Sequence, residues 1–172
     1  AFLHTGAGST LRLSGAKAAG PSSAPCVNGL RVSAQKDVAA PIVDMDPAGA
    51  PNRFESFNGC LPILFDGAIQ GALQNVAVVG GGSAAESLPA VAVVGATSKF
   101  AVRNLLVEKP QASGLVVQGS DFELEKVKVV SPGVVGMNLL PGSYRSRDLE
   151  VTDAKIAGIG VQEGSKLSAR GR

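Results

Sequence analysis

Apolar and polar residues alternate along short stretches of this chain, and in its second half the stretches recur at a constant distance. Val127 and Val129 are apolar with lysines between and before them, and Leu149 and Val151 repeat the pattern 22 residues later. The same step of 22 relates Gly114, Gly136 and Gly158, and also Phe100, Phe122 and Tyr144. Alternation is typical of strands, and a constant period of roughly 20 to 30 residues is typical of solenoids.

Helices are not predicted, because Gly, Pro and β-branched residues interrupt every stretch long enough to form one. An α/β fold needs helices between its strands, and so short a step leaves no room for them. A β-sandwich has similar strands but no reason to keep a constant step. The sequence therefore predicts an all-β fold, a right-handed parallel β-helix with coils of roughly 22 residues.

We predict one domain over residues 1–172, with irregular early coils in 1–60 and regular coils in 61–172. The early part alternates only briefly, around Leu11–Leu13 and Ile42–Asp46. The step from Val76 to Leu105 is longer than those that follow it, which indicates an insertion at Gly80–Glu86. No capping pattern follows the last coil. We therefore expect a segment of a longer chain, or a protein partner or further segment that caps the open coil ends.

Charged residues of opposite sign follow one another in the columns that this period predicts. The predicted outward columns are Arg103–Glu125–Arg147, Asn104–Lys126–Asp148–Arg170 and Leu106–Lys128–Glu150–Arg172. Adjacent positions 103 and 104 cannot both face outward in one straight strand, so we expect a corner between them. Alternating charges on neighbouring strands attract, which indicates that these columns stabilise the stacking and its register.

The segment Gly114–Val129 and its repeat at Gly136–Val151 resemble the right-handed parallel β-helix family with the pectin-lyase-like fold. The resemblance covers Leu61 to Arg172. Members of this fold include polysaccharide lyases, glycoside hydrolases, sugar epimerases, phage tailspikes and non-catalytic surface stalks. The resemblance therefore implies a fold and leaves the activity open.

Asp44 and Asp46 are the weak candidates for a catalytic or metal site. They lie two residues apart on one predicted strand and so project from the same face. Paired carboxylates could act as general acid and base on a glycoside, or bind Ca²⁺ as in a polysaccharide lyase. The alternative is a solvated strand end that leads into the turn at Pro47. No other cofactor is indicated.

Composition limits the remaining classes of function. A net charge of +2 and the absence of a basic cluster with aromatic residues argue against nucleic acid. No apolar run reaches the roughly 18 residues of a membrane span. Cys26 and Cys60 could form one disulfide between coils or remain two buried thiols, and the sequence leaves both open.

An apolar interaction face is predicted from Leu64, Val94, Val116 and Leu140, which occupy outward positions on different coils. The inserted loop or a protein partner could cover it. We therefore expect a non-enzymatic structural or binding module, at the cell surface or extracellular, that contacts a polysaccharide or a protein. The alternative is a lyase-type or hydrolase-type enzyme, or a fragment of one, with its acidic site near Asp44 and Asp46.

Overall fold

The chain is all-β in a computed structural model that describes residues 2–4, 8–20, 28–34, 39–97 and 99–170. The described residues form strands and turns and contain no helix. The strands are β1 (Phe2–His4), β2 (Thr10–Leu13), β3 (Lys17–Ala19), β4 (Leu30–Ser33), β5 (Ile42–Met45), β6 (Asn52–Glu55), β7 (Ile63–Asp66), β8 (Gln70–Val79), β9 (Val91–Ala96), β10 (Phe100–Glu108), β11 (Leu115–Gly119), β12 (Phe122–Val130), β13 (Val135–Leu139), β14 (Ser143–Thr152), β15 (Ala157–Val161) and β16 (Lys166–Arg170).

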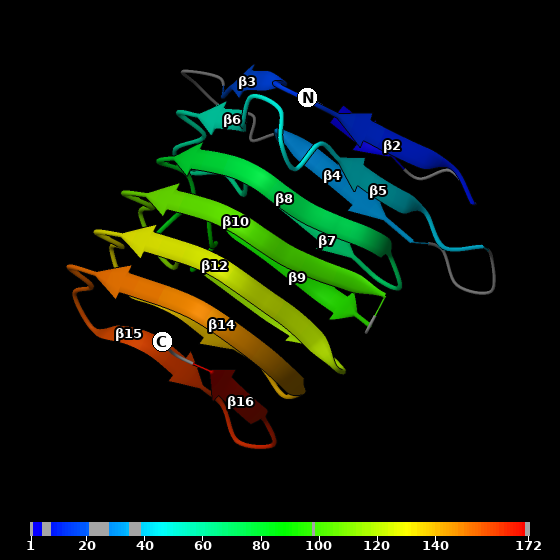
Figure 1. Ribbon diagram of the computed structural model, residues 1–172. Coiled ribbons are helices and arrows are strands. Elements are labelled where there is room, and N and C mark those ends of the chain that lie inside the picture. The colour runs from blue at the N-terminus through cyan, green and yellow to red at the C-terminus, as the bar shows by residue number, and fades with distance from the viewer. Residues whose placement is uncertain (1, 5–7, 21–27, 35–38, 98, 171–172) are drawn as a thin grey trace.

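These strands form two sheets in which all neighbours are parallel. Sheet A has the order β1-β4-β7-β9-β11-β13-β15. Sheet B has the order β16-β14-β12-β10-β8-β5-β2, and β3 and β6 extend it beside β8. From β7 onward each strand of sheet A is followed along the chain by a strand of sheet B. The layers therefore stack in sequence order, with the two ends of the chain at opposite ends of the stack (Figure 1).

The strand register agrees with the repeat in the second half of the chain. Leu105 pairs with Val127 and Val127 with Leu149, which is the predicted step in both cases. Leu105 also pairs with Val76, and here the step is longer. Most of the surplus lies where the insertion is predicted, because the connection from Val79 to Val91 is longer than the one between their strand partners, Glu108 and Leu115. The strands β1–β8 pair at unequal steps, all of them longer than the step from Leu105 to Val127.

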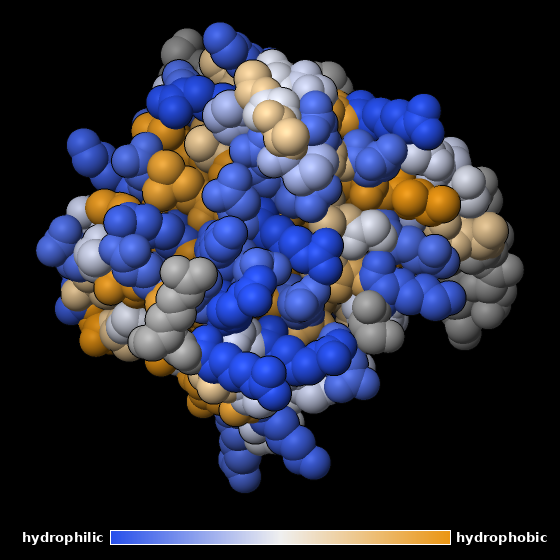
Figure 2. Space-filling model, viewed as in Figure 1, coloured by the Kyte–Doolittle hydropathy of each residue, from blue (hydrophilic) through white to orange (hydrophobic). Residues whose placement is uncertain are grey.

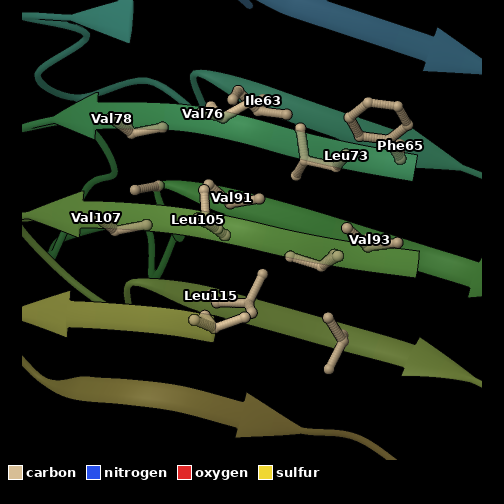
Figure 3. Packing of buried hydrophobic residues seen from close by; sticks show 14 of the residues in the cluster. Ile63, Phe65, Leu73, Val76, Val78, Val91, Val93, Leu105, Val107 and Leu115 are labelled. Carbon is tan, nitrogen blue, oxygen red and sulfur yellow. The ribbon is translucent and has the colours of Figure 1, made fainter. Parts of the chain in front are cut away.

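The core lies between the two sheets and consists of the inward residues of both. Side chains from β7, β9 and β11 point toward side chains from β8 and β10 (Figure 3). A column of aromatic rings runs through it, with 6.2 Å between the ring centroids of Phe100 and Phe122 and 6.4 Å between those of Phe122 and Tyr144. Phe65 extends the column from sheet A, 5.1 Å from Phe100. The Phe100 and Phe122 rings are stacked and those of Phe122 and Tyr144 meet edge to face, and such ring contacts add to the apolar burial that stabilises the layers.

The long strands of sheet B bend at one residue each, and these residues form a corner. Asn75, Asn104, Lys126 and Asp148 have φ angles of 53°, 47°, 52° and 55°, in the left-handed region. None of them takes part in the ladder, although the residues on both sides do. Asn and Asp adopt this conformation more readily than most residues because their short side chains bond locally. The predicted corner between positions 103 and 104 is confirmed.

The last column of the predicted register is wrong by one residue. Ser143 pairs with Lys166 and Arg147 with Arg170, so Arg170 lies beside Arg147 and not beside Asp148. The predicted step would turn every side chain of β16 to the opposite face, with Lys166 inward and Leu167 outward. The additional residue lies in the turn 162–165, which replaces the shorter turn 140–142 of the preceding layer. Arg172 lies outside the described residues.

Candidate functional site

The outer face of sheet B has many polar and charged side chains. Figure 2 views this face, and hydrophilic side chains form a broad band down its middle, over the strands at the front of Figure 1. The register places Arg103, Glu125 and Arg147 side by side on β10, β12 and β14. Parallel strands lie about 4.8 Å apart, so neighbouring side chains in such a column are within contact distance.

Glu125 belongs to a group of four linked charges on this face. Its carboxylate accepts a hydrogen bond from the Arg147 guanidinium and lies 3.9 Å from Nε of Arg103. Arg103 also donates to Glu123, with 2.6 Å between Nη2 and Oε2. The Arg147 hydrogen bond lowers the pKa of Glu125 and raises that of Arg147, because each charge stabilises the other. The predicted alternation of charge is confirmed for this column.

The two other predicted columns have different outcomes. Lys128 and Glu150 form an ion pair, with 2.7 Å between Nζ and Oε1. Lys126 and Asp148 are corner residues, and no ion pair joins them in the described part of the chain. In these two columns the charges pair in the extended part of the strands and not at the corner.

Asp44 and Asp46 line one hollow of about 480 Å³ at the other end of the same face. Asp44 is paired with Arg12 on β2, at 3.1 Å from Nε. Asp46 accepts hydrogen bonds from the Ala48 backbone N–H at 2.9 Å and from the Ser14 hydroxyl at 3.2 Å. Hydrogen bonds from backbone N–H groups of Ala48 and Gly49 lower the pKa of Asp46. A general acid needs a raised pKa at neutral pH, so Asp46 is poorly suited to that role.

The sequence also raised a metal site and a disulfide. Within the described ranges, no group of three or more His, Cys, Asp or Glu side chains is arranged to hold a metal ion. Cys60 is disulfide-bonded. Cys26, the chain's other cysteine, lies outside the described residues.

The predicted apolar face of sheet A consists of two neighbouring columns. Leu64 and Val116 share one column, with the buried Ala92 between them. Val94 belongs to the next column, between Asp66 and Gln118, and Leu140 directly follows β13. All four predicted side chains are half-buried. The apolar column ends after Val116, because Asn138 and Gly160 occupy its next two positions.

The inserted loop after β8 contacts the neighbouring turn instead of extending freely. Gly82 bridges to both Asn58 and Cys60, and Ser83 pairs with Leu88 in a short antiparallel turn. The tip of that turn, residues 84–87, is exposed. These contacts place the loop beside the turn that precedes β7, so they supply no cover for Leu64 or Val116.

Sequence reasoning missed a hollow at the β14–β16 end of sheet B. Its volume is about 340 Å³, and it is lined by Glu123, Leu124, Glu125, Arg145, Ser146, Arg147, Ser168 and Arg170. Three arginines converge here because Arg170 lies beside Arg147 and Ser168 lies beside Arg145. The signal was present in Lys166–Arg170, where Leu167 and Ala169 alternate with polar residues and so define which side chains face outward.

Comparison with known proteins gives no relative: no family model, no curated protein and no solved structure matches this chain. A search of the described residues for helices finds none long and apolar enough to cross a membrane.

Proposed function

We propose that this chain is a non-enzymatic structural or binding module built as a right-handed parallel β-helix, with coils of roughly 22 residues in its regular part. Its outer surface on sheet B contacts a polysaccharide or a protein partner, at the cell surface or outside the cell. The constant step at which β10 pairs with β12 and β12 with β14 supports the coil length. The disulfide at Cys60 supports an oxidising compartment.

One observation carries the non-enzymatic part: the carboxylates of the polar face are already engaged. Asp44 is paired with Arg12, Asp46 is held by Ser14 and a backbone N–H, and Glu125 lies between two arginines. Carboxylates used as general acid and base need pKa values that differ in opposite directions, with one raised. The pKa values of Asp46 and Glu125 are both lowered, the direction opposite to what a general acid needs.

Contact through this face depends on charge and hydrogen bonding. The described aromatic side chains, Phe54, Phe57, Phe65, Phe100, Phe122 and Tyr144, are all buried in the core. Stacking of a ring on a sugar or on an apolar side chain is therefore not offered by this part of the surface. Rows of Arg, Glu, Gln and Ser at strand spacing instead suit a polar, extended ligand.

The test is an assay on a panel of uronate-containing and neutral polysaccharides, with product formation and retention on the immobilised polymer measured in parallel. We expect no product with the wild-type chain, and retention that Arg103→Gln weakens. Product that is lost in Asp44→Asn and kept in Asp66→Asn, a matched acid on sheet A, would show an enzyme and overturn the proposal.

A further inference from the structure

The register of β16 brings three arginines together on the outer face of sheet B. Arg170 pairs with Arg147, and Arg145, two residues before Arg147, lies beside Ser168. Like charges on directly opposed strand positions repel one another and lower stability. The alternation of charge that holds through Arg103, Glu125 and Arg147 therefore ends at the step to β16.

The carboxylates nearby do not balance this group. Glu123 is bonded to Arg103, and Glu125 is bonded to Arg147. Arg145 donates to the backbone oxygen of Asp121 at 3.3 Å and forms no ion pair in the described part of the chain. Arg170 likewise has no ion-pair partner among the described residues. Glu123 and Glu125 also line the hollow, but each is bonded to another arginine, so the guanidinium groups of Arg145 and Arg170 line it without a carboxylate partner of their own.

We infer that this hollow binds a tetrahedral oxyanion, the sulfate or phosphate group of a larger ligand. Its volume of about 340 Å³ exceeds what one such group needs, so the rest of the ligand has room to continue along the face. Arg145 and Arg170 can donate from neighbouring strands, and Ser168, which also lines the hollow, lies beside Arg145 and two residues before Arg170. Guanidinium groups bind oxyanions through paired, charge-assisted hydrogen bonds.

Sulfate or phosphate fits this lining better than a carboxylate. Donors converge from two adjacent strands, and a tetrahedral group presents three or more oxygens in different directions, whereas a carboxylate presents two in one plane. A bound anion also removes the repulsion between Arg147 and Arg170. The inference rests on the proposed function, because it names the chemical group that a binding module of this kind recognises.

Titration calorimetry at low ionic strength tests the site, with sodium sulfate, inorganic phosphate and dextran sulfate as separate probes and unsulfated dextran as the blank. The test variant is Arg145→Gln/Arg170→Gln. The control is Arg53→Gln, which removes one arginine from β6, where its partner is Glu55. The substituted residues Arg145, Arg170 and Arg53 are exposed or half-buried, so the variants should fold. The thermal midpoint of each variant checks this.

We expect sulfate and phosphate affinity to fall about tenfold or more in the double variant, the size of losing charge-assisted hydrogen bonds, and to stay within about twofold in Arg53→Gln. Arg170→Lys should keep part of the affinity because it retains the charge but not the paired donors. Dextran sulfate binding that follows the same order indicates a polymer-borne group, and loss confined to the free anions indicates a small ligand.

Two outcomes would overturn the site. One is equal loss in the double variant and in Arg53→Gln, which would indicate general charge attraction. The other is free-anion binding that the double variant leaves unchanged. Either would leave the proposed module intact if retention on a polymer or partner persists. Catalytic turnover would instead overturn the module and leave the anion site standing.

Discussion

Two neighbouring steps between strands of sheet B differ in the charges on their outer surface. From β10 through β12 to β14 the step is constant and a glutamate lies between two arginines. From β14 to β16 the step becomes one residue longer, and Arg147 lies between Glu125 and Arg170. Glu123 also pairs with Arg103, so the first arrangement has as many acids as arginines, whereas the second leaves Arg145 and Arg170 without an acidic partner among the described residues. A single additional turn residue therefore separates a stabilising surface from a candidate binding surface.

The inward side of the same two steps differs as well. Phe122 and Leu124 are fully buried, whereas Leu167 on β16 is 36% exposed and Ile159 and Val161 on β15 are 38% and 48% exposed. The apolar column through Phe122 and Tyr144 continues to Leu167 in the last layer, but the apolar area there is only partly removed from water. Most of the hydrophobic stabilisation comes from the layers of β8 to β14.

The largest expected effect on stability is at the inward position of β12, Phe122, and it is compared with the inward position of β16, Leu167. Phe122→Ala should lower the free energy of unfolding by about 3–5 kcal/mol, because it removes a buried ring and leaves a cavity between Phe100 and Tyr144. Leu167→Ala should cost about 1 kcal/mol or less, since its side chain is already partly hydrated. Urea unfolding of both variants measures this, and equal losses would show that the last layer is packed as tightly as the others.

Tyr144 lies at the boundary between the two regions, and Tyr144→Phe should cost about 1–3 kcal/mol. Its hydroxyl donates to the backbone oxygens of Val117, at 3.0 Å, and Leu140, and both would lose a buried donor.

Burial raises the pKa of Tyr144 above its usual 10.0. The wild type should therefore lose stability as the pH rises above about 10, since only the unfolded chain ionises readily. The variant should lack this loss, and a parallel pH dependence in both chains would contradict it.

The corner of sheet B tests how much stability depends on backbone conformation. Lys126 has a φ of 52°, and Lys126→Val should cost about 1–2 kcal/mol because a β-branched residue is strained in the left-handed region. Lys126→Gly should be close to neutral, since glycine adopts this φ without strain but loses more entropy on folding. Thermal unfolding of the two variants separates the strain at a positive φ from the loss of the lysine side chain. Similar losses for both would mean that the lysine side chain, not the backbone, matters at this corner.

The sequence predicted the elements whose side-chain pattern is periodic. Val127 and Val129 repeat in Leu149 and Val151, and one face must be buried, so strand register follows from the spacing. The corner at Asn104 followed from the same reasoning, because adjacent outward positions require a turn. In both cases a single physical requirement, burial of alternate residues, was sufficient.

The hollow at the β14–β16 end and the contacts of the acids do not follow from the period of 22, although the alternation within Lys166–Arg170 indicates which of its side chains face outward. The additional residue in the turn 162–165 has no periodic signature, and it alone places Arg170 beside Arg147. Asp46 is held by the backbone N–H of Ala48, which depends on the local path of the turn. Arg103 prefers Glu123 over its register partner Glu125 as its closer contact, 2.6 Å against 3.9 Å, because side-chain conformation decides between two acids on one strand.

The smallest expected effects have opposite signs in the two regions. Glu125→Gln should lower stability by about 0.2–1 kcal/mol, because it removes the acid between Arg103 and Arg147 on a partly exposed face. Arg170→Gln should raise stability by a few tenths of a kcal/mol, roughly the repulsion between opposed like charges.

The lowered pKa of Glu125 sets the pH range over which Glu125 contributes to stability. Its contribution should be complete above about 4.5, the usual value, and disappear as the pH falls through the lower pKa of the folded chain. Urea unfolding at neutral pH and near pH 3, at low and high salt, measures both variants. If Arg170→Gln destabilises the chain without any anion present, Arg147 and Arg170 do not repel each other, and the difference between the two steps is one of packing alone.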